Sequence, residues 1–197
     1  MQSEDKDKVV WTTSKSGAFS VKSLYSILEP RGSSLFPCDS IWRANVPPKV
    51  AFFAWEASRG KVLTLEQLQR RGCLLENRCF LCLPEVDTMD HLLLYCVKTW
   101  ALWNLFFSLF GVTWVLSGSV KETLIGWHGA FVGKTRKKVW QMTPLCIFWS
   151  VWKEMNLLAF GNEELSLQRL KYSFVCNLWS WVRVFIVLSP SSFVSFF

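Results

Sequence analysis

The chain has 197 residues, half of them hydrophobic, with 12 Trp and 16 Phe, which excludes a disordered tail and predicts one substantial domain, or a domain with a small appendage, around a large aromatic core. Its 22 basic and 15 acidic side chains give a net charge of +7, and the excess lies mainly in residues 99–197. This charge is compatible with a nucleic-acid partner and equally with an ordinary basic surface.

The sequence predicts an intracellular protein of the cytoplasm or nucleus, not a secreted one. Its start, MQSEDKDKVVW, is charged and has no apolar run of the kind a secretory signal needs. Seven Cys, two of them in a Cys-x2-Cys pair, are more often metal ligands than disulfides in a reducing compartment. The apolar stretches 139–160 and 174–188 are interrupted by charges or too short for a bilayer, so we expect buried helices and no membrane.

In chain order, the first predicted element is a small β-hairpin over residues 8–21, two short strands around a Gly-containing turn. A helix over 21–29 should follow, capped by Ser20 and ended by Pro30. The segment 47–60 begins with two prolines, which a first helical turn tolerates, and continues with helical apolar spacing. Between these two helices we expect a loop over residues 31–40.

The rest of the chain is predicted to be helical around one short Cys-containing segment. Thr64 and Gln67 form a capping box for a helix that ends at Gly72. Further segments with helical apolar spacing are 98–110 (ended by Gly111), 119–126, 135–159 (containing Pro144) and 167–186 (capped by Ser166). The fold class is therefore mainly α, a helical domain with a small N-terminal β-hairpin.

Four side chains of the metal-ligand type lie within the segment 79–96: Cys79, Cys82, His91 and Cys96, in the pattern Cys-x2-Cys-x8-His-x4-Cys. A Cys-x2-Cys turn can direct two thiolates at one ion, and the later His and Cys complete a tetrahedron of three sulfurs and one nitrogen. Thiolates favour zinc over magnesium or calcium. Four protein ligands leave no position for a substrate water, so we predict one structural Zn2+ in a CCHC knuckle. The alternative is ordinary buried Cys and a core His.

The spacing of the last two ligands places a demand on the backbone. His91 and Cys96 are five residues apart, which an ideal α-helix would place about 140° apart, so we expect the chain to bend or to end its helical turn near Cys96. Asp87 is predicted to cap this turn, and Asp90 to be a capping or solvated group. The remaining cysteines are predicted to be core residues: Cys38, Cys73, Cys146 and Cys176.

Several blocks of sequence carry a family resemblance: VVWTTSKSGAFSVKSLYSIL, IWRANVPPKVAFFAWEASRGKVLTLEQLQRRG, CFLCLPEVDTMDHLLLYC, TWALW and, more faintly, FWSVWKEMNLLAF. In this order they resemble the zinc-binding domain that follows the reverse transcriptase in plant non-LTR (LINE-type) retroelement proteins. The ligand positions of that family match Cys79, Cys82, His91 and Cys96 one by one.

The resemblance implies a reverse-transcriptase-type zinc-binding domain over residues 8–110, with its knuckle at 79–96. A C-terminal helical extension over 111–197 is expected to pack on it. The family's presumed role is to help an element's polymerase handle nucleic acid, so the expected partners are RNA or DNA and the polymerase portion of a retroelement protein. The chain carries no polymerase or endonuclease portion, which also fits a remnant of such an element.

The strongest nucleic-acid feature is a run of cations, Lys134, Arg136, Lys137 and Lys138, which can contact successive phosphates. Three arginines flank the knuckle and can add phosphate contacts: Arg70, Arg71 and Arg78. The alternative is that the run is a solvated helical turn or a nuclear-import signal. Phe80 and Leu81, between the two cysteines of the pair, can offer an apolar or stacking surface to an unpaired base. The alternative is that one of them packs under the knuckle.

We expect no catalysis. The segment GAFVGKT at 129–135 has three residues between its glycines where a phosphate-binding loop needs four. His128 has no nucleophile elbow near it, and the few carboxylates after residue 98 do not form the cluster that ribonuclease H chemistry needs. The predicted function is a low-specificity nucleic-acid-binding accessory module. The rivals are a structural or protein-interaction module with an aromatic surface, and a remnant without function; the oligomeric state stays open.

Overall fold

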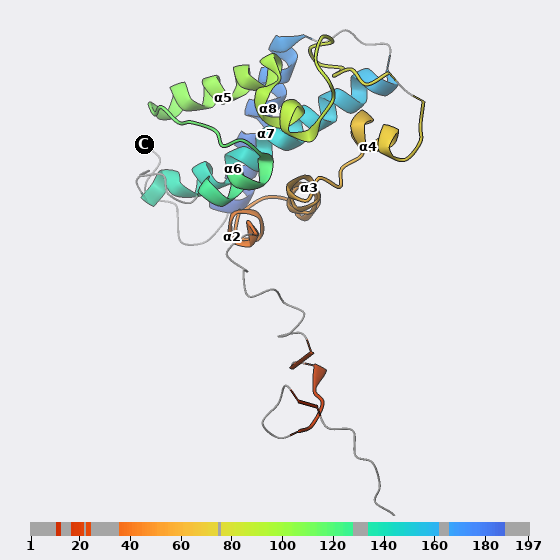
Figure 1. Cartoon of the computed structure of the whole chain (residues 1–197). Coiled ribbons are helices and arrows are strands. Elements are labelled where there is room, and N and C mark those ends of the chain that lie inside the picture. Colours follow the sequence, from red (N-terminus) through yellow and green to blue (C-terminus); the bar gives the residue numbers. More distant parts are fainter. Residues whose placement is uncertain are drawn as a thin grey trace, which may run out of the picture. The chain divides into compact units, whose positions relative to one another are not determined.

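Helices dominate the part of the chain that the computed structural model describes, which comprises residues 11–12, 17–21, 23–24, 36–74, 76–127, 134–161 and 166–187. The chain divides into two compact units, residues 1–36 and 37–197. The helices of the second unit (Figure 1) are α2 (Cys38–Trp42), α3 (Pro48–Ser58), α4 (Leu65–Arg70), α5 (Val97–Phe110), α6 (Val120–Gly126), α7 (Lys134–Phe160) and α8 (Leu167–Val182), with π-helical turns at His91–Tyr95 and Arg183–Val187.

The predicted N-terminal β-hairpin is wrong for the residues of that segment that are described. Residues 11–12 and 17–20 contain no strand. One backbone hydrogen bond, from the Trp11 N–H to the Gly17 carbonyl (2.9 Å), closes a turn, and the rings of Trp11 and Phe19 pack edge to face with centroids 5.0 Å apart. A single bond and one ring contact can close a loop without the ladder of bonds that a hairpin needs. Residues 8–10 and 13–16 lie outside the described residues.

The predicted helix cap at Ser20 is present in the first unit. The Ser20 hydroxyl accepts the Ser23 N–H (3.1 Å), and the Leu24 N–H donates to the Ser20 carbonyl (3.0 Å). The described residues after the cap, Val21, Ser23 and Leu24, are helical. The remainder of the predicted helix, residues 25–29, lies outside the described residues.

The caps predicted at Thr64 and Ser166 are present. The Thr64 hydroxyl accepts the Gln67 N–H (3.3 Å), but the Thr64 N–H donates to the Val62 carbonyl (2.9 Å) instead of completing the capping box. The Ser166 hydroxyl accepts the Arg169 N–H (3.5 Å), and Ser119, a cap that was not predicted, accepts the Glu122 N–H (3.2 Å). Gly111 ends α5 in the left-handed conformation, with φ of 63°, which a residue with a Cβ adopts only at a cost.

One helix was not predicted from the sequence. Residues 38–40, expected to belong to a loop, form α2 together with Ile41 and Trp42, with an acidic residue, Asp39, in its first turn. Five residues are too few for an apolar period to show itself. Cys38 begins this helix and is exposed, and Cys73, just past the left-handed Gly72, is exposed as well, so the prediction that both are core residues was wrong. Cys146 is buried and Cys176 half-buried.

Aromatic side chains build the core that α7 shares with its neighbours α3, α5 and α8. The rings of Trp127 and Trp140 stack with centroids 4.6 Å apart. Each indole N–H donates to the other residue's backbone carbonyl, at 2.8 Å from Trp127 and 3.3 Å from Trp140. This reciprocal pair satisfies two buried polar groups and ties the end of α6 to α7. Within the described ranges, no helix combines the length and apolar character needed to cross a bilayer.

The end of α5 gives a test of local backbone strain. A Cβ at Gly111 would meet no atom within 4 Å, so Gly111→Ala should cost only the left-handed conformation, about 1–2 kcal/mol of unfolding free energy. Denaturant unfolding of the zinc-loaded protein measures it. Gly118→Ala is the matched control, because its Cβ would lie at an ordinary 3.5 Å from the Glu122 carboxylate and its backbone is not left-handed. An equal loss in both variants would contradict the argument.

Candidate metal centre

The structure brings the four predicted ligand residues together. One ligand atom from each of Cys79, Cys82, His91 and Cys96 lies within 4.8 Å of the others. The Cys79 and Cys96 sulfurs are 4.0 Å apart, and the Cys82 sulfur is 3.3 Å from the His91 Nε2. A tetrahedral zinc with bonds of about 2.3 Å to sulfur requires ligand–ligand separations of about 3.8 Å. The donor set and its spacing therefore fit one zinc ion.

A tight turn positions the first two ligands. The Leu83 N–H donates to the Cys79 carbonyl, and the Cys79 N–H donates to the Glu85 carbonyl, both at 2.8 Å. Leu83 has a φ of 70°, in the left-handed region that a non-glycine residue enters only under constraint. The backbone amides of Cys82 and Leu81 face the Cys79 sulfur and favour its thiolate.

A π-helical turn positions the other two ligands. The Cys96 N–H donates to the His91 carbonyl over 2.6 Å, a bond from residue i+5 back to residue i. This bond closes a wider turn than an α-helical one, so five residues bring the chain back to nearly the same side. The backbone then becomes extended at Cys96 and enters α5. The spacing of the ligands predicts a departure from the α-helix near Cys96, and the structure shows it as a π-helical turn followed by an extended residue.

Side chains of α5 hold the wide turn in place. The Thr99 hydroxyl donates to the Leu92 carbonyl (2.6 Å), and the Trp103 indole N–H donates to the Leu93 carbonyl (3.1 Å). Both side chains are fully buried, where an unpaired carbonyl is costly. Sequence reasoning missed both residues, because their spacing from the ligands carries no motif.

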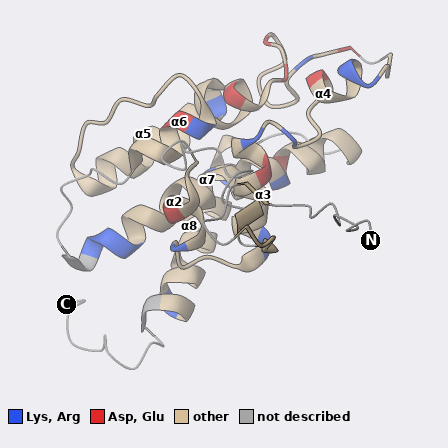
Figure 2. Cartoon of the chain, turned by 60° about the horizontal axis from the view of Figure 1, so that its bottom comes forward, with Lys and Arg blue, Asp and Glu red and all other residues tan. Residues whose placement is uncertain are grey.

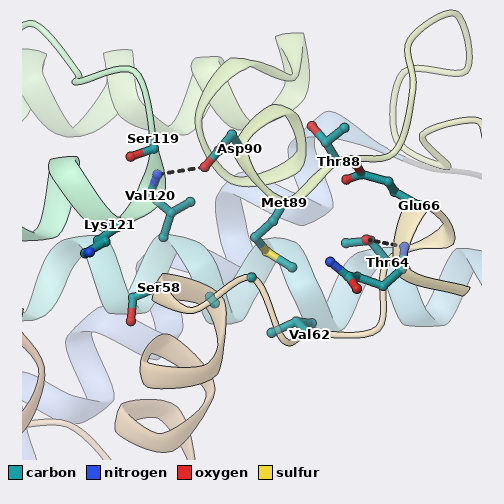
Figure 3. A pocket seen from close by; sticks show the side chains of 13 residues that line it. Ser58, Val62, Thr64, Glu66, Thr88, Met89, Asp90, Ser119, Val120 and Lys121 are labelled. Atoms are coloured by element: carbon teal, nitrogen blue, oxygen red, sulfur yellow. Dashed lines mark hydrogen bonds between the residues drawn. The ribbon is translucent and has the colours of Figure 1, made fainter. Parts of the chain in front are cut away.

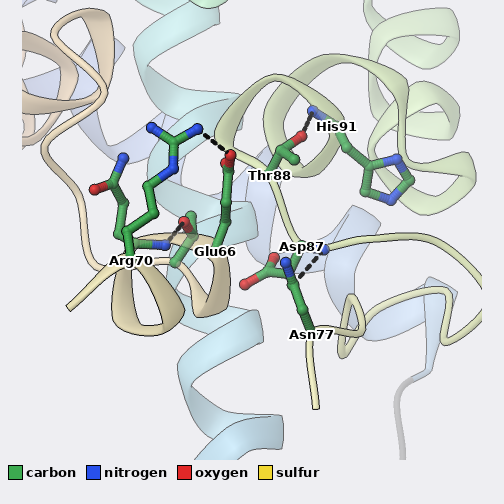
Figure 4. Close-up of polar contacts among 8 residues, drawn as sticks. Glu66, Arg70, Asn77, Asp87, Thr88 and His91 are labelled. Atoms are coloured by element: carbon green, nitrogen blue, oxygen red, sulfur yellow. Dashed lines mark hydrogen bonds and ion pairs between the residues drawn. The ribbon is translucent and has the colours of Figure 1, made fainter. Parts of the chain in front are cut away.

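Asp87 does not cap the knuckle turn as predicted. Its carboxylate accepts the Leu65 N–H (2.9 Å) at the start of α4, and its own N–H donates to the Asn77 side chain (3.0 Å). The cap of the turn is Thr88, whose hydroxyl accepts the His91 N–H (3.1 Å); Figure 4 shows this arrangement. Asp87 thus links α4 to the knuckle. A Thr three residues before a ligand His is a capping signal that the sequence did contain.

Burial perturbs the Asp87 carboxyl. The side chain is completely buried, and this burial raises its pKa above the ordinary value, against the opposing effects of the Leu65 amide and of His91. The folded state therefore binds the carboxyl proton more tightly than the unfolded chain does. Because the folded-state pKa is the higher one, protonation of Asp87 stabilises the fold at low pH. This contribution to stability is lost as the pH rises through the raised pKa.

The four ligand side chains have unequal environments. Cys79 and Cys96 are completely buried, whereas Cys82 and His91 are half-buried. The hydrogen bond between Cys79 and Cys96 raises the pKa of the former, as burial also does, and lowers the pKa of the latter. Burial raises the pKa of Cys82 and lowers that of His91. The lowered pKa favours the neutral form of His91, which is the form that binds a metal.

The predicted nucleic-acid residues form two groups along the chain. The knuckle-flanking arginines are exposed, and two of them form ion pairs, Arg70 with Glu66 and Arg78 with Glu76. The second group opens α7, and Lys and Arg positions are blue on the ribbon of Figure 2. The side chains of Arg136, Lys137 and Lys138 are exposed. Lys134 begins this helix, and its side chain lies outside the described part, as do His128 and residues 129–133 of the rejected phosphate loop.

A polar hollow of about 310 Å³ lies beside the knuckle, between α3, α4 and α6 (Figure 3). Its polar side chains act on neighbouring backbone: Asp90 accepts the Val120 N–H (2.8 Å), and Thr64 and Ser119 cap helices. Asp90 therefore acts as a capping group, one of the two roles predicted for it. The polar side chains of the hollow are there because they satisfy the backbone amides of helix ends that meet beside the knuckle. We therefore assign the hollow no ligand.

Comparison with known proteins identifies the domain. Residues 19–103 match the family described as zinc-binding in reverse transcriptase. These residues are a zinc-binding domain of the reverse-transcriptase type. The match contains all four clustered ligand residues, and zinc is the cofactor of this zinc-binding domain.

The similarity to one relative extends beyond the zinc-binding domain of this chain. An Arabidopsis thaliana protein named "Putative ribonuclease H protein" is 33% identical to this chain over 173 residues, which are 85% of the chain and 27% of that protein. The chain thus spans about a quarter of the length of this relative. No solved structure matches the chain.

Removing the support of the π-helical turn should weaken zinc binding. Thr99→Val keeps the shape of the side chain but leaves the buried Leu92 carbonyl unpaired, at a cost of about 1–3 kcal/mol. We expect lower zinc affinity in competition with a chromophoric chelator. Thr143→Val is the matched control, because the buried Thr143 hydroxyl bonds to the Val139 carbonyl within α7 (2.8 Å). An equal loss of affinity in both variants would argue against a positioning role.

The unequal burial of the ligands predicts unequal effects of the same substitution. The wild-type protein should contain one zinc per chain by elemental analysis, and both Cys79→Ser and Cys82→Ser should lose it. Cys79→Ser should also lower the free energy of unfolding by about 1–3 kcal/mol more, because its hydroxyl is buried without a metal partner. Equal denaturation midpoints for the two variants would contradict this.

Proposed function

We propose that Cys79, Cys82, His91 and Cys96 coordinate one structural Zn2+ in a domain that binds nucleic acid with little sequence specificity. The ion has no catalytic role in this proposal. The donor set supports it, because three sulfurs and one nitrogen complete a tetrahedron and leave no position for a substrate water. When bound, the ion supplies a fixed cross-link between the Cys-pair turn and the π-helical turn.

The observation that carries nucleic-acid binding is the exposed cationic start of α7. Arg136, Lys137 and Lys138 are consecutive and exposed, and each can neutralise a phosphate and release a counterion. Lys134 begins the same helix. Near the knuckle, the exposed ion pairs of Arg70 and Arg78 are worth little in water, so both side chains can exchange to phosphate. Arg71, beside Arg70, is a third candidate.

We further propose that the chain is non-catalytic. The described carboxylates after residue 98 support this. Glu154 is buried and pairs with Arg169 (3.3 Å), whereas Glu122 is exposed in the first turn of α6. They do not share a site, and the chain covers only a small part of the relative named as a ribonuclease H protein.

For this chain we propose a zinc-binding domain over residues 8–110 and a helical extension over residues 111–197 that packs on it. The contacts of α7 with α3 and α5 support this division.

We also propose a retroelement origin, with RNA or DNA as a partner and the polymerase portion of an element protein as a second one. An exposed apolar face on α8 favours a protein contact as the second candidate function: Tyr172, Val175 and Trp179 are 73%, 45% and 63% exposed. Nucleic-acid binding weakens steeply with salt, whereas an apolar interface does not. A remnant without function should bind neither nucleic acid nor a protein partner.

Replacing Arg136, Lys137 and Lys138 by Ala should weaken binding to every nucleic-acid sequence alike. Each phosphate contact removed should lower the salt slope of the binding constant by about one unit. Fluorescence anisotropy with RNA and DNA at two salt concentrations measures this.

The control variant removes an equal number of exposed cations elsewhere: Arg43, Lys121 and Arg183. It should bind more tightly than the α7 variant. Equal affinities would refute the proposed surface, and no binding by the wild type at low salt would refute the function.

A further inference from the structure

The outer face of α7 carries a hollow rich in aromatic surface. Trp149, Trp152, Lys153, Asn156 and Leu157 line it, and its volume is about 360 Å³, within the range of about 300–1,000 Å³ typical of small-ligand pockets. The two Trp rings are half-buried, and the lysine and leucine are exposed. An apolar floor beside one cation and one amide, whose NH2 group also donates to the Trp152 carbonyl (2.9 Å), can hold a planar ligand with polar edges.

The Trp rings of this hollow are held from inside by α3. The buried Phe53 lies 5.3 Å from Trp152 in a stacked arrangement, with 29° between the planes, and 5.7 Å from Trp149 edge to face. Such aromatic contacts fix ring orientation. The rings are therefore set before a ligand arrives, which lowers the entropic cost of binding.

Two cationic side chains lie over Trp rings on or near the hollow. The Lys49 ammonium lies 5.4 Å from the centroid of the Trp149 ring, and the Arg59 guanidinium lies 4.8 Å from that of Trp55. Lys153 adds an exposed charge within the hollow itself. Of the nearby acids, Glu154 faces the core and pairs with Arg169, and Glu56 is half-buried on α3. The exposed charges around the hollow are thus mainly positive.

The hollow continues toward the zinc knuckle. Asn156 also lines a second, smaller hollow, together with Phe160 at the end of α7 and Phe80 from the Cys-pair turn. The one acidic side chain in its lining, Asp87, is completely buried and accepts the Leu65 N–H. Phe160 is 89% exposed, and Phe80 is half-buried. The two hollows share one helix face, and we call them together the aromatic groove. Its planar side chains, in order toward the knuckle, are Trp149, Trp152, Phe160 and Phe80.

We propose that the aromatic groove binds an unpaired nucleic-acid strand, with bases stacked on its rings and phosphates beside Lys49 and Lys153. This rests on the proposed nucleic-acid function and specifies the form of its ligand. Stacking tolerates any base, because every base has a π-face, but it requires bases that are not already stacked in a duplex. An apolar helix would bring no negative charge to Lys49 and Lys153, whereas a strand with a phosphate at each nucleotide complements both charges.

Two groove variants and one control test the proposal. Trp152→Leu keeps apolar volume against Phe53 but removes the stacking surface, and Phe160→Ala changes a side chain that is almost fully exposed, so it should not affect folding. Trp179→Leu on α8, at a position 63% exposed and outside the groove, is the matched control. Anisotropy titrations use labelled single-stranded DNA and RNA oligonucleotides and a duplex of the same sequence, with the zinc-loaded full chain.

The groove variants should bind single strands about 5- to 150-fold more weakly per lost stacking contact, with affinity for duplex nearly unchanged. Single-strand affinity equal to that of the Trp179→Leu control would overturn the proposal, as would equal losses for single strands and duplex. A change only in self-association, seen by sedimentation, would assign the groove to a protein contact instead. If the groove variants bind normally while the α7 cation variant does not, the nucleic-acid function stands without the groove. Absence of binding by the wild type removes both.

Discussion

The wide turn between His91 and Cys96 is the constraint on which the metal centre depends. Two ligands five residues apart do not share a face of a regular α-helix. Here the helix widens to bring them together, and a wider helix departs from the regular α-helical bond pattern. The helix that follows supplies the missing partners, through the hydroxyl of Thr99 and the indole of Trp103. The zinc site and α5 are therefore parts of one structure.

This coupling joins the metal to the aromatic core. Trp103 bonds to the ligand-bearing turn on one side and packs against Trp127 on the other, with ring centroids 5.4 Å apart. Trp127 in turn exchanges hydrogen bonds with Trp140 of α7. A chain of buried rings thus runs from the ligands to the longest helix. Loss of the ion should therefore destabilise more than the knuckle, because two of the ligand side chains, Cys79 and Cys96, are part of the buried core.

The surface divides into regions of different chemistry. The start of α7 is cationic, its C-terminal half carries the aromatic groove, and α8 exposes an apolar face. Cations provide salt-dependent affinity for any phosphate chain, whereas planar rings distinguish unpaired from paired bases. One helix thereby combines the two interactions that low-specificity binding of single strands requires.

The sequence by itself determined the ligand set, most helix positions and their caps, because ligand type, apolar period and capping residues act over a few neighbouring positions. It failed where distant residues decide. The expected hairpin at 8–21 is a turn closed by one bond where it is described, and Asp87 caps α4 instead of its own turn. The exposure of Cys38 and the grouping of Trp149 with Phe80 along one face likewise follow from how helices pack. Only the tertiary structure decided these, because burial and partnership across the fold depend on contacts that no local pattern encodes.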